Sequence, residues 1–186
     1  MNPIHKTLKI VAIATLLAFL TLVYGIQPKA AFAANTSEVA EAIILSTSDP
    51  SQVLGKVSFS QTSDGMQIAT EIQNAPPGKH GFHIHEFGSC EDAGNAAGGH
   101  FNPDGVKHGN LISEGFRNAH AGDLGNLTIF SDGTAQKNVT ISRLTLKGEK
   151  YAIAGRAIII HAQEDNFSQP TGNAGGRIGC GAIAKL

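Results

Sequence analysis

The segment 78–88, GKHGFHIHEFG, carries three histidines among apolar and aromatic residues: His80, His83 and His85. Such a segment is typical of a β-strand, in which successive side chains point to opposite faces. His83 and His85 are therefore expected to share a face, and His80 to point away from it unless a bulge intervenes. Two neutral imidazoles on one strand face form a good half-site for copper or zinc.

Four further histidines follow along the chain: His100, His108, His120 and His161. His161 ends the apolar segment GRAIIIH, so it can deliver a third ring to the face that carries His83 and His85. In HAGD, His120 and Asp123 place an imidazole and a carboxylate close together. Three imidazoles and one carboxylate suit a closed tetrahedral zinc site. A single loop histidine is more often solvated, but this arrangement of six predicts metal binding.

Short segments rich in β-branched residues have to position these groups. We expect strands at residues 39–46, 53–60, 66–73, 79–87, 124–130, 134–141, 151–162 and 178–185. Asp-Gly pairs in SDGM (63–66) and SDGT (131–134) indicate hairpins. No long segment after residue 33 has helical periodicity, glycine is abundant at 22 residues, and tryptophan is absent. These features predict an all-β protein with an eight-stranded antiparallel sandwich or barrel.

Two connections, residues 88–123 and 163–177, are too long for simple turns. Long loops without regular structure in a compact domain are usually either functional or disordered. The first connection holds Cys90 and three of the histidines, and both are rich in glycine. We therefore predict that both loops are functional.

Residues 1–33 are typical of an export signal. A basic start with Lys6 and Lys9 precedes an apolar run over 10–24, and AFA, residues 31–33, offers small residues to a peptidase. The run is shorter than the roughly 20 residues of a spanning helix. We expect cleavage after Ala33, which leaves a domain of residues 34–186 in a periplasm, a lumen or the extracellular space, most typically of a bacterium. An uncleaved signal would instead tether the same domain to a membrane.

The net charge excludes one class of partner. The chain has 14 basic and 15 acidic side chains, and residues 1–33 hold three lysines and no acid. The remaining 11 basic and 15 acidic side chains give residues 34–186 a net charge of −4. Such a domain offers no basic patch for nucleic acid.

Cys90 and Cys180 are the two cysteines of the chain. In an exported protein an even pair indicates a disulfide, which would close a loop worth about 4 kcal/mol in the loop-entropy model. The alternatives are two buried free thiols or two zinc ligands. Export argues against free thiols, and the number of histidines argues against thiolate ligation.

Several motifs together resemble those of the copper/zinc superoxide dismutases. They are GFHIHEFG, GGHFNPDGVKHG, HAGDLGN, GRAIIIH and TGNAGGRIGCG, and they occur in the family's order from about residue 39 to the C-terminus. The resemblance implies an eight-stranded Greek-key β-barrel with two long functional loops, which agrees with the strand count above. It also implies one copper and one zinc ion per subunit.

The resemblance assigns each ligand to a position of this chain. The implied copper ligands are His83, His85, His100 and His161. The implied zinc ligands are His100, His108, His120 and Asp123. His100 belongs to both sets because the family bridges its two metals with one imidazolate.

The resemblance also implies roles for residues outside the ligand sets. Arg177 matches the arginine beside the copper, and its planar donors suit a small anion. Asp165 matches a carboxylate that joins a copper-site histidine to a zinc-site histidine and orients both rings. Thr171 is expected to narrow the channel mouth. Cys90 and Cys180 match the family's intrasubunit disulfide. His80 matches no ligand, so we expect a packed, hydrogen-bonded structural histidine.

The implied activity is the dismutation of superoxide to dioxygen and hydrogen peroxide by redox cycling of copper, with zinc as a structural ion that holds His100. Arg177 and His100 would be the catalytic residues. The alternative is a non-enzymatic exported protein that binds copper and zinc on the same fold. The last long loop contains no lysine to guide the anion. The segment 91–99 is longer than its counterpart in familiar members, and that segment contributes to dimer contacts in some relatives. The resemblance therefore does not fix the oligomeric state, and a homodimer is one alternative.

Overall fold

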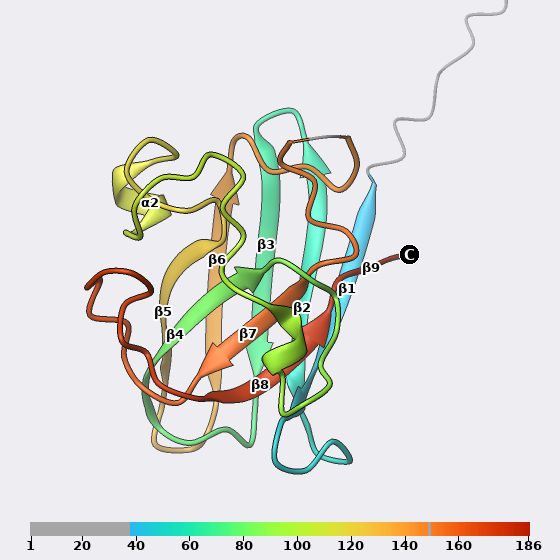
Figure 1. The fold of residues 1–186 in the computed structure, drawn as a ribbon. Helices are drawn as coiled ribbons and strands as arrows, with labels where there is room; N and C mark the ends of the chain where they lie inside the picture. The colour runs from blue at the N-terminus through green and yellow to red at the C-terminus, as the bar shows by residue number, and fades with distance from the viewer. Residues whose placement is uncertain (1–37, 149) are drawn as a thin grey trace, which may run out of the picture. The chain divides into compact units, whose positions relative to one another are not determined.

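The computed structural model describes residues 38–148 and 150–186. The predicted signal peptide, residues 1–33 with cleavage after Ala33, lies outside the described residues. Nine strands are present in the described part of the chain: β1 (Val39–Ser46), β2 (Val53–Thr62), β3 (Gly65–Ile72), β4 (Gly78–His85), β5 (Asp123–Ile129), β6 (Ala135–Ile141), β7 (Ala157–His161), β8 (Arg177–Ala182) and β9 (Ala184–Lys185) (Figure 1). Two short helices, η2 (Asn95–Ala97, 3₁₀) and α2 (Leu111–Glu114), lie in the loop between β4 and β5.

Eight of the strands form one curled antiparallel sheet in the order β5-β4-β7-β8-β1-β2-β3-β6, and the two-residue β9 pairs with β1. The chain order is broken at β4, which lies between β5 and β7, and at β6, which pairs with β3. These crossings are those of Greek-key connections. The sheet curls until its end strands, β5 and β6, face each other across a seam without ladder pairing. The predicted all-β Greek-key barrel is therefore confirmed.

Alternation along the strands separates the barrel interior from its outer surface. In β3 every second residue from Met66 to Ile72 is buried, which is the pattern of a sheet with one solvent-exposed face. Phe59, Phe82, Leu124 and Ile158 are among the fully buried side chains of the interior. These side chains come from four different strands, so the strands turn one face each towards a single core.

The strands that carry the site differ because both of their faces are covered. All five residues of β7 are buried, as are the last six of β4. Phe82 and Ile84 pack in the main core, whereas His83 and His85 have the opposite parity and lie on the outer face of the barrel wall. Since the long loops lie over that face, the histidines are buried there rather than solvated.

Two predicted strands are too long. Segment 151–162 is a strand only at Ala157–His161, because the chain turns at Gly155, where φ is +79°. Segment 178–185 is divided into β8 and β9 at Ile183, whose backbone bonds to Gly155 and Arg156 instead of continuing the ladder. The other six predicted strands differ from the observed bounds by at most two residues.

Among the described residues no helix has the length and apolar character needed to cross a membrane.

Candidate metal centre

The structure brings the predicted ligands into two adjoining groups, built from β4, β7, the start of β5 and the first long loop. His83, His85, His100 and His161 form one group, and His100, His108, His120 and Asp123 form the other. Within each group the potential ligand atoms lie within 4.8 Å of one another, and every member is buried. His100 is common to both groups.

Strand pairing explains the first group. β4 pairs with β7, so His83 and His85 lie on the strand next to the one that ends in His161. An isolated bridge between His85 and His100 brings the loop back beside the last residue of β4. The ring centroid of His100 lies 4.1 Å from that of His83 and 5.0 Å from that of His85.

Asp123, the first residue of β5, organises the second group. Its Oδ1 lies 2.8 Å from His100 Nδ1 and 3.2 Å from His120 Nδ1. Its Oδ2 accepts hydrogen bonds from the backbone N–H groups of Gly109 and His120. Burial alone raises the pKa of a carboxyl, but the hydrogen bonds from the histidines outweigh it and hold the pKa of Asp123 far below its usual range. The group therefore contains a permanent buried anion.

Asp165, in the second long loop, joins the two groups. Its Oδ2 accepts from His83 Nε2 at 2.9 Å, and its Oδ1 accepts from His108 Nε2 at 3.0 Å. Gly172 makes this approach possible, because a Cβ at its φ of +77° would collide with both Asp165 and His108. Because each ring donates to Asp165 from Nε2, Nδ1 is the nitrogen with a free lone pair when the ring is neutral.

The nitrogens that face inward fit divalent metal ions. Nδ1 of His83 and of His108 is buried without a hydrogen-bond partner, and His108 Nδ1 lies 2.8 Å from Asp123 Oδ2 without hydrogen-bond alignment. His85 and His161 donate from Nδ1 to the carbonyls of Gly98 and Gly175. Their Nε2 atoms, both then lone-pair acceptors, face each other at 3.3 Å. Such a contact is unfavourable by itself, and a shared cation would make it favourable.

The pKa values of three histidines of the first group favour the neutral ring. Burial disfavours the charged form and lowers the pKa of His83 to about 4, of His161 to about 3 and of His85 to about 2. In the second group burial acts in the same direction on His108, but the adjacent carboxylates of Asp123 and Asp165 prevail and raise its pKa to about 9. The neutral imidazole, favoured here for His83, His85 and His161, is the form that binds a metal.

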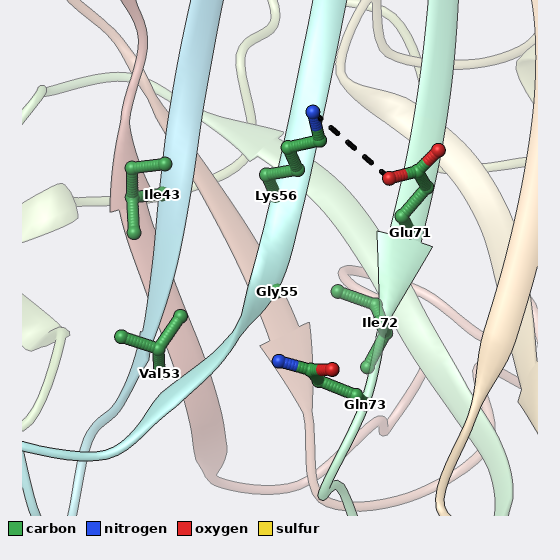
Figure 2. A pocket seen from close by; sticks show the side chains of 7 residues that line it. All are labelled: Ile43, Val53, Gly55, Lys56, Glu71, Ile72 and Gln73. Atoms are coloured by element: carbon green, nitrogen blue, oxygen red, sulfur yellow. Dashed lines mark ion pairs between the residues drawn. The ribbon is translucent and has the colours of Figure 1, made fainter.

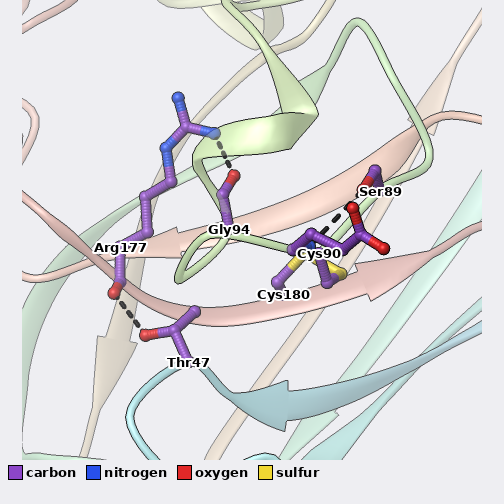
Figure 3. Close-up of a disulfide and its surroundings, with 7 residues drawn as sticks. Thr47, Ser89, Cys90, Gly94, Arg177 and Cys180 are labelled. Atoms are coloured by element: carbon purple, nitrogen blue, oxygen red, sulfur yellow. Dashed lines mark hydrogen bonds between the residues drawn. A yellow bond between two sulfur atoms is a disulfide. The ribbon is translucent and has the colours of Figure 1, made fainter.

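Arg177, the first residue of β8, is the predicted anion-binding residue. Its guanidinium donates from Nη1 to the Gly94 carbonyl and from Nη2 to the Gly98 carbonyl, the latter at 2.6 Å. The Gly98 carbonyl also accepts from His85 Nδ1, so the guanidinium lies beside the first group. Figure 3 shows the side chain reaching from β8 to the loop that contains Gly94.

The same loop is tied to β8 by the predicted disulfide. Cys90 and Cys180 are bonded, with their Cα atoms 5.7 Å apart (Figure 3). Thr47 adds a hydrogen bond from its hydroxyl to the backbone carbonyl of Arg177. The disulfide and these hydrogen bonds hold the loop and the arginine in one arrangement.

The remaining predicted residues lie outside the two groups. Thr171 is exposed in the turn just before Gly172. His80 is buried, and its two ring nitrogens lie 2.8 Å from the His161 carbonyl oxygen and 3.0 Å from that of Pro76. His80 is therefore packed and hydrogen-bonded, as expected of a structural residue.

Sequence reasoning missed Asn126. Its side-chain Oδ1 accepts from the backbone N–H of Asp165 at 2.8 Å, and its Nδ2 donates to the Asp165 carbonyl at 2.9 Å. Its place in HAGDLGN, three residues after Asp123, is the signal that could have identified it.

A surface pocket of about 270 Å³ lies apart from these residues, on β1, β2 and the end of β3 (Figure 2). Its lining is Ile43, Val53, Gly55, Lys56, Glu71, Ile72 and Gln73. None of the predicted site residues contributes to it.

Comparison with known proteins agrees with this geometry. Residues 53–183 match the model of the copper/zinc superoxide dismutase family. An extracellular Cu-Zn superoxide dismutase from Brugia pahangi is 36% identical over 158 residues, which cover 80% of this chain and 77% of that protein.

Solved structures with the same fold include a clock protein, EA4, with a TM-score of 0.70 and 33% identity over 81% of this chain and 96% of that one. A SOD-like protein from Bacillus subtilis has a TM-score of 0.67 and 35% identity over 76% of this chain and 96% of that one. Both similarities extend over almost the whole of the solved chains. On its motifs, its barrel and these matches, the chain belongs to the copper/zinc superoxide dismutase family, and it is an oxidoreductase whose cofactors are copper and zinc.

Proposed function

We propose that the chain converts superoxide to dioxygen and hydrogen peroxide at one site with two metals. In this proposal His83, His85, His100 and His161 hold copper, and His100, His108, His120 and Asp123 hold zinc. The observation that carries it is the position of His100, which belongs to both groups of ligands. With His100 in both groups, its ring would couple a redox ion to a structural one.

Copper would supply one-electron redox chemistry in both directions, and zinc, which has no redox chemistry of its own, would supply a fixed charge beside His100. The chain's own residues then have to hold the ligand rings and manage protons. Nδ1 of His100 faces Asp123, so Nε2 is the nitrogen that faces the first group. We assign to Nε2 the carriage of one of the two protons that peroxide requires.

Arg177 binds the substrate anion in this proposal. Two of its donors are used on the carbonyls of Gly94 and Gly98, and this orients the guanidinium without neutralising it. A fixed positive charge with spare donors beside the copper ligands suits a diatomic anion. Thr171, exposed in the second long loop, would limit the width of the entrance.

Asp165 orients His83 and His108 through their Nε2 atoms. We assign it the role of keeping Nδ1 of both rings available to the metals. A ligand whose tautomer is set in advance does not have to reorganise when the metal binds.

We further propose that the protein acts outside the cytoplasm, with residues 1–33 removed as a signal. The disulfide between Cys90 and Cys180 supports this proposal, because such bonds persist in oxidising compartments. The extracellular relative from Brugia pahangi also agrees with export. Mass spectrometry of the protein recovered from its host would give the cleavage site, and an intact N-terminus would contradict cleavage.

Metal analysis and a superoxide-consumption assay on the same sample test the enzyme. We expect one copper and one zinc per chain and a rate far above that of free copper. Stoichiometric metals without such activity would favour the non-enzymatic metal-binding alternative. The His100→Ala variant tests the bridge: it should lose both activity and the dependence of the copper spectrum on zinc, and retention of both would exclude the bridge.

A further inference from the structure

One residue of β6 departs from the pattern of its strand. Ala135, Lys137, Val139 and Ile141 share the face that is turned towards the core, and Ala135 and Ile141 are buried in it. Lys137 is half-buried there, with its Nζ atom 6.0 Å from the centroid of the Phe82 ring. A lysine in such a position loses hydration, so it needs partners that compensate for the loss.

The partners of Lys137 are two backbone carbonyls on the facing strand. Its Nζ donates to the carbonyl oxygens of Leu124 and Asn126, each at 2.7 Å. Within residues 38–148 and 150–186, no carboxylate lies within salt-bridge distance of this ammonium group. Burial accordingly lowers the pKa of Lys137 from its usual value. The side chain is thus committed to the backbone of β5.

These bonds cross the seam of the barrel. β5 and β6 are the two ends of the sheet order, and no ladder joins them (Figure 1). A strand edge without a neighbour leaves backbone groups that need other partners. The ammonium group of Lys137 supplies donors where an adjacent strand would otherwise supply them.

The bonded segment of β5 is irregular, and it belongs to the metal centre. Three residues of β5 span the step from Asp123 to Asn126, while two residues of β4 span the opposite step from His83 to Gly81. The extra residue bulges the strand at Gly125, where φ is +74°. The two carbonyls that accept from Lys137 belong to the residues on either side of Gly125, so the lysine bonds to both sides of the bulge.

Both ends of the bulge position residues of the site. Asp123 is the carboxylate of the second group, and Leu124 follows it directly. Asn126, at the other end, holds the backbone of Asp165 through two hydrogen bonds. Asp165 in turn reaches His83 and His108. A shift of the bulge would therefore move a member of one group and the carboxylate that joins both.

We propose that Lys137 is a positioning residue for the metal centre: its ammonium group closes the seam between β5 and β6 and holds the bulge that presents Asp123 and Asn126. This inference rests on the proposed function, since it takes the two groups as metal sites. Lys137 touches neither metal nor substrate, and it acts through the backbone of Leu124 and Asn126.

Zinc affinity, measured by competition with a chromophoric chelator, tests the proposal without reference to activity. Lys137→Met removes the donors and keeps most of the apolar stem. We expect its zinc affinity to fall about tenfold, as is common when groups behind metal ligands are lost. Lys137→Arg keeps donors on a long stem and should restore most of the affinity. The electronic spectrum of Co²⁺ bound in the zinc position should change in Lys137→Met and return in Lys137→Arg.

Val139→Ala is the matched control, because it lies on the same strand and face and removes core packing without removing a hydrogen bond to β5. It should lower stability and leave zinc affinity within about twofold of the wild type. Equal zinc affinity in Lys137→Met and the wild type would overturn the proposal, and so would an equal loss in Val139→Ala.

Wild-type protein that bound neither metal would overturn this inference together with the proposed function. Normal binding in both the wild type and Lys137→Met would overturn this inference alone. If Lys137→Met does not fold, Lys137→Gln, which keeps an NH2 donor group but loses the positive charge, is the variant that decides. Intermediate zinc affinity would support the proposal, and wild-type affinity would refute it.

Discussion

Individual hydrogen bonds decide which nitrogen of each histidine is available to a metal. His83 and His108 donate from Nε2 to Asp165, whereas His85 and His161 donate from Nδ1 to backbone carbonyls. Strand parity, read from the spacing, was enough to predict that His83 and His85 share a face. It could not predict the tautomers, because those depend on partners up to 82 residues away.

Replacement of Asp165 by asparagine tests the shared carboxylate. Asp165→Asn keeps the shape but has one acceptor oxygen for two N–H donors, so one of His83 and His108 loses its orientation. We expect zinc affinity to fall by about 10- to 100-fold, as measured by chelator competition. Glu164→Gln, an exposed neighbour that pairs with Lys79 at 3.0 Å, should bind zinc normally. Wild-type affinity in Asp165→Asn would contradict the assigned role.

The metal-free protein should lose stability in mild acid. Its buried His83 and His161 have pKa values of about 4 and 3, whereas an ordinary histidine has a pKa of 6.5. Below about pH 6.5 the unfolded chain binds protons that the folded chain does not, so the free energy of unfolding falls as the pH falls towards these values. We expect a loss of about 2 kcal/mol or more between pH 7 and pH 5, measured by urea unfolding. A flat profile would argue against neutral buried rings.

At the scale of elements, the loop after β4 and the strand β8 form one unit. The disulfide connects them, and Arg177 at the start of β8 bonds to two carbonyls of that loop. Six strands were predicted closely because turn residues bound them. The excess length of the seventh and eighth predicted strands has a tertiary cause, since Ile183 bonds to residues 155 and 156 across the sheet. α2, with four residues, is too short to show helical periodicity.

Removal of the disulfide should affect both stability and the arginine. The bond spans 90 residues, for which the loop-entropy model gives about 4 to 5 kcal/mol. The double variant Cys90→Ser, Cys180→Ser should lose stability of this order in urea unfolding. Its turnover should also fall, because the loop carbonyls no longer hold the guanidinium in place. Full activity at a temperature where the variant remains folded would show that the position of Arg177 does not depend on the disulfide.

At the scale of the whole molecule, an anionic substrate has to reach a protein of negative charge. The predicted mature chain has a net charge of −4, and its last long loop has no lysine.

The two groups of ligands and the barrel could be predicted because the motifs cover most of the chain. The role of Lys137 could not be predicted, since the seam that it crosses exists only after the sheet has curled.

The ionic-strength dependence of the rate tests whether Arg177 attracts the substrate. We expect the second-order rate constant of the wild type to fall as salt is added, since screening weakens a local attraction. Arg177→Ala should be slower by about tenfold at low salt, with a flat or rising salt profile. Lys56→Ala, on the pocket of Figure 2, should retain the wild-type slope. An unchanged rate in Arg177→Ala at low salt would contradict the proposed role of Arg177 in attracting the substrate.

One peptide unit connects the two halves of the chemistry. The Gly98 carbonyl accepts from His85 Nδ1 at 2.9 Å and from Arg177 Nη2 at 2.6 Å. Gly98 has a φ of +76°, and a Cβ there would strike the Phe87 ring. The separation between His85, the proposed copper ligand, and Arg177, the proposed anion-binding residue, is therefore set by a backbone oxygen to which both side chains donate. A shift of that oxygen would move Arg177 and His85 together, so the gap between them that superoxide has to fit would keep its width.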